Sequence, residues 1–394
     1  MQENWRSARS DVAAVMTSTY KENQQREAAL QKLWIVVIAC ILFGTLGARG
    51  ALAENVVVGV NVVGVDQLSE AQQDALVAQL RRDGVTTVRT GFGPTFQHFI
   101  TRAYQSGIDA VVILYPMQGS TGPLRPADPA VGLTWRQQAL SDANPEAFKE
   151  WLVPQLAALE ASGVRLTALE LGNEINSPHF NGDFLPAQAT GRLLGLSDLT
   201  NPNDLEGHAI ATGYLKYLKV MAALKDVRDH SRLNRKTPIL SAGLASSGLP
   251  GKKPGWKLDG VSVSDTLAFW RKNGIDNLVD GYGMHAYTAP DPNRTVSVLI
   301  DVLNKDAFAM CTSRKPCWLT EWGFDNRNTS CPVDETTRMK LIETMRGALQ
   351  QLSAQGRLAG FLYYSWAGHP GEVGSTIFRC GALTDAGKLA LSPM

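Results

Sequence analysis

The sequence lacks a net excess of charge. Its 38 Lys and Arg residues are balanced by 37 Asp and Glu residues, which leaves a net charge of +1 over 394 residues. No run of Lys or Arg forms a basic tail. Because nucleic acids and anionic surfaces are bound mainly through clustered positive charge, we expect no nucleic-acid partner.

Motifs for metals and nucleotide cofactors are also missing. There is no C-x-x-C pair, and no G-x-G-x-x-G opens the first strand–helix unit, where Gly91-Phe92-Gly93 is only a turn. We therefore expect neither a metal nor a cofactor. Five histidines show no metal-ligand spacing: His98, His179, His208, His230 and His369.

The N-terminal apolar run is too short for an ordinary membrane span. Residues 33–46 are apolar apart from one Gly and one Thr, whereas a span needs about 20 apolar residues. Ala51-Leu52-Ala53 follows, with small residues at the positions that a signal peptidase reads. We expect residues 1–53 to be a polar lead with an export signal, and residues 54–394 to form one domain of a secreted, periplasmic or cell-envelope protein.

The polar lead before this run is unusually long for an export signal, and two interpretations of it stay open. Either the true start lies near Met16, or residues 33–48 are an uncleaved membrane anchor that follows a short cytoplasmic tail. Only the second interpretation gives the protein a contact with a membrane.

Cysteine is scarce, and its distribution agrees with export. Cys40 lies in the apolar run, and the other four cysteines all fall in the last third of the chain. An even number of cysteines in an exported chain favours disulfides, although four unrelated thiols are the alternative. We expect Cys311 to pair with Cys317 across a short loop, and Cys331 to pair with Cys380.

Short apolar runs alternate with amphipathic stretches from Asn55 onward. Runs that are apolar throughout suit parallel strands buried on both faces, and their alternation with helices predicts βαβ units. Eight such units predict a (β/α)₈ TIM barrel, with a doubly wound sheet as the alternative. The expected strands are Val56–Val63, Thr86–Thr90, Ala110–Tyr115, Leu166–Gly172, Pro238–Gly243, Gly281–Ala286, Cys317–Glu321 and Phe361–Trp366. The expected helices include Glu70–Arg82, Pro94–Gln105, Pro145–Ser162, Leu205–His230, Asp265–Lys272, Thr295–Lys305, Asp334–Gln355 and a short last one near Leu383–Leu391.

Two connections are long enough to form walls around a binding site. Met117–Asn144 follows the third expected strand and Ile175–Asn203 follows the fourth. Both belong to the carboxyl-terminal face of a barrel, where barrel enzymes place their sites. Aromatic rings in these loops and in the loop after strand five would suit the apolar faces of sugars, although packing is the alternative for each: Trp135, Phe180, Phe184 and Trp256.

Two carboxylates interrupt apolar strand ends. The fourth strand runs into Asn173-Glu174, and the seventh ends at Glu321. A carboxylate beside a buried strand needs a reason, because such groups are rarely buried without partners. Glycoside hydrolysis needs such a pair, one carboxyl held neutral as the acid and one ionised as the nucleophile.

These strand ends resemble clan A of the glycoside hydrolases, the retaining enzymes built on (β/α)₈ barrels. The resemblance implies that Asn173 binds the sugar 2-hydroxyl, that Glu174 is the acid/base and that Glu321 is the nucleophile. Glu170 lies on the same strand as Glu174, and we expect it to be a structural ion-pair partner instead.

Further strand ends resemble the cellulase-type family 5 of that clan. The resemblance implies that Arg89 steadies the charge of the nucleophile, that Tyr287 hydrogen-bonds it beside His285, and that Trp366 stacks under the sugar. An ordinary ion pair for Arg89 and a core position for His285 are the alternatives. The chain departs from the family pattern after strand three, where Tyr115 replaces a His, and after the acid/base, where Ile175 replaces a Pro. We count Tyr115 and Trp322 among the candidate substrate-binding residues.

Taken together, these residues predict a monomeric retaining glycosidase that cleaves a β-linked poly- or oligosaccharide by double displacement. Arg89 and Tyr287 would keep Glu321 anionic, and a drier setting would raise the pKa of Glu174. The two carboxyls should lie ~5–5.5 Å apart, since ~6.5–9.5 Å would imply inversion. A transglycosylase with the same site and a non-catalytic carbohydrate-binding barrel of the cell envelope are the alternatives.

Overall fold

The computed structural model describes residues 56–134, 136–186, 190–246, 257–287, 308–328, 330–368 and 374–394. The chain divides into two units, Met1–Glu54 and Asn55–Met394, and the described residues all belong to the second. Several predictions therefore fall outside the described residues: the export signal or anchor, the rings of Trp135 and Trp256, and the helix expected at Thr295–Lys305.

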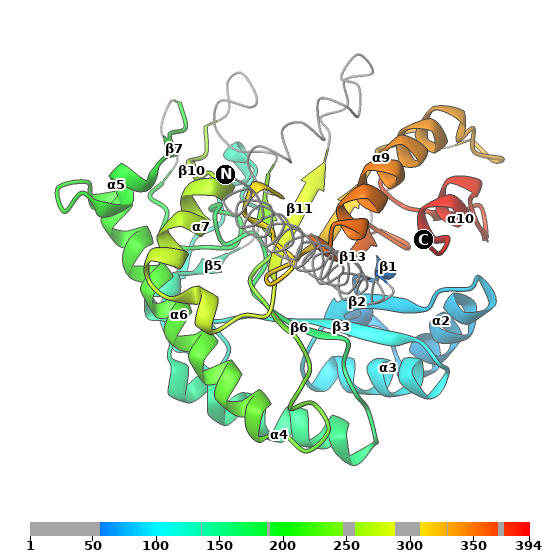
Figure 1. Cartoon of the computed structure of the whole chain (residues 1–394), viewed down its shortest axis with the longest axis horizontal. Helices are drawn as coiled ribbons and strands as arrows, with labels where there is room; N and C mark the ends of the chain where they lie inside the picture. The colour runs from blue at the N-terminus through cyan, green and yellow to red at the C-terminus, as the bar shows by residue number, and fades with distance from the viewer. Residues whose placement is uncertain are drawn as a thin grey trace, which may run out of the picture. The chain divides into compact units, whose positions relative to one another are not determined.

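Nine parallel strands form one curled sheet in the order β8-β6-β3-β2-β1-β13-β12-β11-β9 (Figure 1). The strands at the two ends of this order, β8 and β9, are separated in the sequence only by Ser241, Ala242 and Gly243. A further bridge links Leu240 to Gly281. The strands are β1 (Val57–Asn61), β2 (Thr87–Gly91), β3 (Asp109–Leu114), β6 (Ala168–Leu171), β8 (Ile239–Leu240), β9 (Leu244–Ala245), β11 (Tyr282–Tyr287), β12 (Cys317–Gly323) and β13 (Leu358–Tyr363).

Helices surround the outside of this sheet (Figure 1). A curled parallel sheet with an outer layer of helices fits the (β/α)₈ architecture that the sequence predicts. The helices are α2 (Glu70–Arg82), α3 (Pro94–Gln105), α4 (Pro145–Ala161), α5 (Leu196–Thr200), α6 (Leu205–His230), α7 (Val263–Lys272), α9 (Thr336–Ala354) and α10 (Asp385–Leu391).

Successive strand residues point to opposite faces of the sheet, and the two faces contribute to two separate apolar clusters. The outward residues, such as Val112 on β3, join the large core between sheet and helices. The inward residues form a separate small cluster, which on β3 includes Val111. This inner cluster fills one end of the curled sheet and leaves the carboxyl ends of the strands to polar side chains. Its buried members are Val111, Ala168, Leu240, Trp318 and Leu362.

The helix boundaries follow the sequence more closely than the strand boundaries do. α2, α3 and α6 have the predicted ends, and side chains of Ser69 and Asp204 cap α2 and α6. The last strand was expected at Phe361–Trp366, but β13 begins three residues earlier, at Leu358. Apolar residues run through this whole stretch, so composition alone does not fix where pairing begins.

The long loops after β3 and β6 are fastened to one another. Arg125, on the short strand β4 (Leu124–Arg125), donates to the carbonyls of Pro178 and Asn181. The Gly182 N–H donates to the Gln138 carbonyl at 2.9 Å. Other short pairs brace the loops: β4 with β5 (Gln137–Gln138), β7 (Leu193–Leu194) with β10 (Gly260–Val261), and β14 (Phe378–Arg379) with β15 (Ala382–Leu383).

Both expected disulfide pairs are confirmed. The Cα atoms of Cys311 and Cys317 lie 5.4 Å apart, and those of Cys331 and Cys380 lie 5.9 Å apart, with the sulfur atoms bonded in each pair. The first bridge ends at the first residue of β12, Cys317, and the second joins the loop after β12 to the segment after β14. Disulfides on either side of β12 tie down the strand that carries Glu321.

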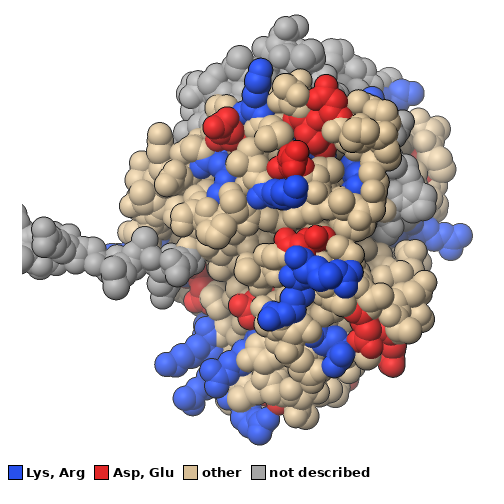
Figure 2. Space-filling model, turned by 90° about the vertical axis from the view of Figure 1, so that its right-hand side faces the viewer, with Lys and Arg blue, Asp and Glu red and all other residues tan. Residues whose placement is uncertain are grey.

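The described surface shows no large area of one charge on the face that carries α2, α9 and α10. Figure 2 shows basic and acidic side chains interspersed there. In the part of the chain that the structure describes, every helix is too short or too polar to cross a membrane.

Glu206 is a buried carboxyl beneath the loop that leads from β6 to α6. It is 3% exposed, its Oε1 accepts the N–H of Leu185 at 2.9 Å, and the guanidinium of Arg192 lies 3.7 Å from its Oε2. Burial raises the pKa of Glu206 to about 7, and the neighbouring buried carboxyl of Asp259 adds to the rise. The folded protein therefore holds a proton here that the unfolded chain releases near the ordinary pKa of 4.5.

We expect the free energy of unfolding to fall as pH rises from about 4.5 to about 7. In this window Glu206 is protonated in the folded state and ionised in the unfolded state, so each pH unit lowers stability by up to about 1.4 kcal/mol. Glu206→Gln, which is neutral at every pH, should reduce this slope. Asp183, whose pKa burial raises to about 6, should keep part of it. Urea unfolding at pH 5 and pH 7.5 tests this, and an equal slope in both proteins would contradict it.

Candidate active site

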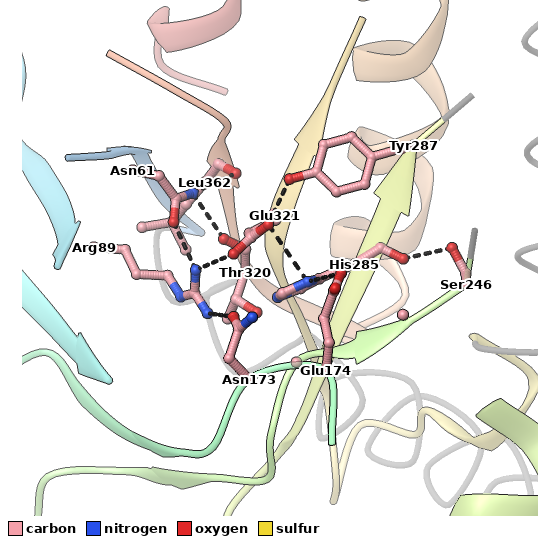
Figure 3. Close-up of polar contacts among 12 residues, drawn as sticks. Asn61, Arg89, Asn173, Glu174, Ser246, His285, Tyr287, Thr320, Glu321 and Leu362 are labelled. Atoms are coloured by element: carbon pink, nitrogen blue, oxygen red, sulfur yellow. Dashed lines mark hydrogen bonds and ion pairs between the residues drawn. The ribbon is translucent and has the colours of Figure 1, made fainter. Parts of the chain in front are cut away.

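Polar side chains converge at the carboxyl ends of the strands (Figure 3). They come from five different places in the sheet, because parallel strands bring their carboxyl ends to one edge. Asn61 ends β1, Arg89 lies on β2, Asn173 and Glu174 follow β6, His285 and Tyr287 end β11, and Glu321 lies on β12.

Arg89 is the centre of this group and is 2% exposed. Its Nε donates to Glu170 at 2.6 Å and its Nη1 donates to Glu321 at 2.6 Å. The remaining donors reach Asn61 at 2.7 Å and Asn173 at 3.0 Å. One guanidinium therefore pairs both with the buried carboxylate of Glu170 and with the carboxylate of Glu321.

Glu170 is the structural carboxylate that the sequence predicts. It is fully buried and accepts hydrogen bonds from the Gly243 N–H at 2.9 Å and the Thr320 hydroxyl at 2.8 Å. With Arg89 as its ion-pair partner, its charge is compensated on every side. Glu170 thus anchors Arg89 from within β6, whereas Glu174 lies beyond the end of that strand.

Glu321 is held ionised by its neighbours. Tyr287 donates its hydroxyl to Oε2 at 2.5 Å, and His285 Nδ1 lies 3.4 Å from the same oxygen. Burial alone would raise the pKa of the Glu321 carboxyl, but the charges of His285 and Arg89 and the hydroxyl of Tyr287 hold it below its ordinary value. An ionised carboxylate with one oxygen on Arg89 and one on Tyr287 has the charge that a nucleophile needs.

Glu174 has a less buried and more strained setting. Its side chain is 23% exposed, against 10% for Glu321, so the expectation of a drier site for Glu174 is wrong. Its backbone has φ 44°, in the left-handed region that non-glycine residues rarely adopt. The carbonyl of Gly243 accepts its N–H at 2.8 Å and helps to fix this conformation.

His285 lies between the two glutamates. It is fully buried, and its Nδ1 is 2.9 Å from Oε1 of Glu174. Because Nδ1 faces carboxylate oxygens, we infer that this nitrogen is protonated. Nε2 is buried and has no hydrogen-bond partner in the part of the chain that the structure describes.

The same three side chains are the described cluster whose spacing could suit a metal ion, with one ligand atom from each within 4.8 Å of the others. Their chemistry fits a metal poorly. Binding through Nδ1 would require that nitrogen to lose its proton and would leave the proton of the ring on Nε2, which has no acceptor among the described residues. Arg89 would also lie beside the cation. These residues are better suited to exchange protons than to hold an ion.

Two tryptophans predicted for substrate binding lie in the core. Trp322 follows Glu321 on β12 and so points to the opposite face, where its ring packs 5.0 Å from that of Tyr363. Trp366 is 2% exposed and stacks on Phe378 at 5.0 Å. Trp322 is excluded from the site by this geometry, and Trp366 would have to be uncovered before a sugar could stack on it.

Tyr115, in contrast, belongs to the site. It follows β3 and is 42% exposed as a whole, yet desolvation raises the pKa of its hydroxyl, on which the charges of Arg89 and Glu321 also act. Tyr115 therefore lies within range of the charges of Arg89 and Glu321 while part of it stays accessible, and its role in substrate binding stays a prediction.

Three residues of the site were missed in the sequence. Asn61 ends β1 and donates to the Thr320 carbonyl at 2.9 Å, and a polar residue closing an apolar strand was a usable signal. His179 feels the charge of Glu174, and burial lowers its pKa. Gly243 carries no side chain, so nothing in the sequence marked its contacts with the site.

No protein-family model matches the sequence, and no curated protein matches it. Solved structures do. A GH5-4 broad specificity endoglucanase from an uncultured bacterium has a TM-score of 0.50 and 11% identity, over 86% of this chain and 94% of that chain. The exo-β-1,4-mannosidase Op5Man5 from Opitutaceae bacterium strain TAV5 has a TM-score of 0.52 and 17% identity, over 85% of this chain and 58% of its own. Both neighbours are glycoside hydrolases, and at such low identity the likeness shows a shared fold.

Proposed function

We propose that this protein is a retaining glycoside hydrolase that acts on a β-linked poly- or oligosaccharide. The observation that carries the proposal is the spacing of Glu174 and Glu321, each of which places an oxygen within 4.8 Å of the other and of His285 Nδ1. This spacing supports the short carboxyl separation of retaining enzymes, ~5–5.5 Å, over the ~6.5–9.5 Å that leaves room for water in inverting ones.

The mechanism follows from the environments of the two carboxyls. Glu321, ionised beside Arg89 and Tyr287, attacks the anomeric carbon while Glu174 gives a proton to the departing oxygen. A covalent glycosyl-enzyme forms on Glu321. Glu174 then takes a proton from water, which attacks the anomeric carbon and restores the free Glu321 with net retention.

The structural setting of this site supports the remaining parts of the proposal. We infer that β8 and β9 are two halves of one fifth strand that closes a (β/α)₈ barrel, since β8 pairs with β6 and β9 pairs with β11. The two neighbours are named as an endoglucanase and an exo-β-1,4-mannosidase, which supports our proposal of a β-glycan as substrate. The two disulfides suit an exported domain, with residues 33–48 as either a cleaved signal or an anchor. We further propose that the domain acts as a monomer on a carbohydrate, with Asn173 and Tyr115 as sugar-binding residues.

We expect the first product released from a β-glycan to be the β-anomer. Retention follows from two successive inversions at the same carbon, whereas a single displacement would give the α-anomer. A screen of β-glycans identifies the substrate, and proton NMR within the first minutes of cleavage measures the anomer. Glu174→Ala, which removes the acid, serves as the inactive control. An initial α-anomer would refute the two-step mechanism.

The two alternative functions give different results in simple assays. A transglycosylase uses the same carboxylates, but at high acceptor concentration it yields longer oligosaccharides in place of free sugar. A non-catalytic binding barrel gains no covalent mass from a 2-deoxy-2-fluoro glycoside, whereas a retaining enzyme accumulates the glycosyl-enzyme. The ionised state of Glu321 favours the enzyme, because binding alone does not require a held nucleophile.

A further inference from the structure

Gly243 lies in the break between β8 and β9, against the middle of the site. Its N–H donates to the buried carboxylate of Glu170 at 2.9 Å, and its carbonyl accepts the N–H of Glu174 at 2.8 Å. A parallel bridge also joins it to Asn173. One glycine thus connects the anchor of Arg89 with the strained backbone of Glu174.

The missing side chain of Gly243 leaves the space that His285 occupies. A Cβ at this position would lie 2.1 Å from Nε2 and 2.5 Å from Cδ2 of the imidazole, and 2.7 Å from the hydroxyl of Thr320. Contacts below 3.0 Å do not occur for real Cβ atoms, so the ring would have to move by about 1 Å.

The imidazole has no free direction in which to move. It is fully buried, and its opposite edge contacts Glu174 at 2.9 Å and Glu321 at 3.4 Å. The backbone of Gly243 does not have a positive φ, so an alanine there meets no backbone strain. The requirement for glycine therefore comes from neighbouring side chains, first from the ring of His285 and then from the hydroxyl of Thr320.

We propose that Gly243 is a positioning residue for the acid/base Glu174, holding its backbone directly and its carboxyl through the packing of His285. The proposal rests on the function proposed above. In glycosylation, Glu174 must present its proton to the departing oxygen, and a displacement of about 1 Å at a reacting group costs about 100-fold in rate. Glu321 keeps its contacts with Arg89 and Tyr287, so its attack on the anomeric carbon should be affected less than proton donation by Glu174.

The test is Gly243→Ala, compared on two glycosides of the same sugar. We expect kcat/KM to fall about 100-fold for a poor leaving group such as an alkyl alcohol, because departure of that group needs the acid. For a 2,4-dinitrophenyl glycoside, which departs without a proton, the fall should stay below about 10-fold. Glu174→Ala should show the same dependence on the leaving group.

Gly360→Ala is the matched control. A Cβ at Gly360 would meet the ring of Trp318 at 2.5 Å, so the variant overpacks an aromatic ring in the same sheet but away from the site. It should be destabilised without dependence on the leaving group. Equal losses for both glycosides in Gly243→Ala, or the pattern of Gly243→Ala repeated in Gly360→Ala, would overturn the proposal.

A second readout does not depend on activity. The imidazole signals of His285 are identified by NMR as those missing in His285→Gln. They should shift in Gly243→Ala and stay in place in Gly360→Ala. If the wild type cleaves no glycoside, the proposed function fails, but the NMR signals still show whether Gly243 packs against His285. Unshifted His285 signals in Gly243→Ala would overturn the positioning role alone.

Discussion

Glu321→Gln is expected to lower turnover of the natural glycan by about 10⁴-fold or more while the protein still folds. An amide has no negative charge with which to attack the anomeric carbon, so no glycosyl-enzyme forms. The fold should persist because Arg89 keeps its ion pair with Glu170, and the lost bond from Tyr287 costs about 1–3 kcal/mol. Steady-state kinetics and urea unfolding measure the two effects.

Glu170→Gln provides the matched control for this prediction. Like Glu321→Gln, it removes one negative charge that pairs with the guanidinium of Arg89, but it does so at a fully buried position that no sugar reaches. If Glu321 acted only through Arg89, the two substitutions would lower activity equally. We expect a much smaller loss in Glu170→Gln, together with the larger loss of stability. Azide added to Glu321→Ala should restore turnover and give the α-glycosyl azide, and rescue with the β-azide would instead assign the acid/base role to this residue.

Arg89→Met is expected to destabilise the protein by about 3–5 kcal/mol. The substitution leaves the carboxylates of Glu170 and Glu321 buried without their shared cation, and uncompensated buried charge is more costly than a missing contact. Arg89→Lys keeps the charge but cannot reach all four partners, so its loss should be intermediate. Urea unfolding at pH 7 measures both.

The pH dependence of Arg89→Met gives this prediction a second test. In the wild type the pKa of Glu321 is lowered, so its stabilising contribution is present above the ordinary value of 4.5 and is lost as pH falls through the lower folded value. Without the arginine, burial should raise the pKa of Glu321 above its ordinary value, and stability should then fall as pH increases. Arg338→Met removes another buried arginine, from Glu335, and is the control for activity: we expect the pH profile of activity to shift to higher pH in Arg89→Met and to stay unchanged in Arg338→Met. An Arg89→Met protein with wild-type stability would contradict the role of Arg89 as the shared cation.

The sequence predicts this fold well because its signals are local. Helices such as Pro94–Gln105 begin at a proline and follow an amphipathic pattern, and both are visible without tertiary information. The paired glutamates were found because a carboxylate at the end of an apolar strand is chemically unusual. The wrong predictions and the missed residues depend on how distant segments of the chain pack against one another. Whether Trp322 faces the site or the helices is set by the register of β12. Gly243 matters because a Cβ at this position would collide with His285.

The pairing of β1 with β13 has a consequence for how the molecule is made. Asn61 near the beginning of the domain donates to the carbonyls of Leu362 and Tyr363, about 300 positions later in the chain. The first strand therefore stays unpaired on one edge until synthesis has passed β13. Such distant pairing slows folding, since the entropy of closing the chain is lost before the contact forms. A ribosome-bound fragment that ends before Leu358 would leave Asn61, a partner of Arg89, without two of its carbonyl acceptors, so the site is completed late in synthesis.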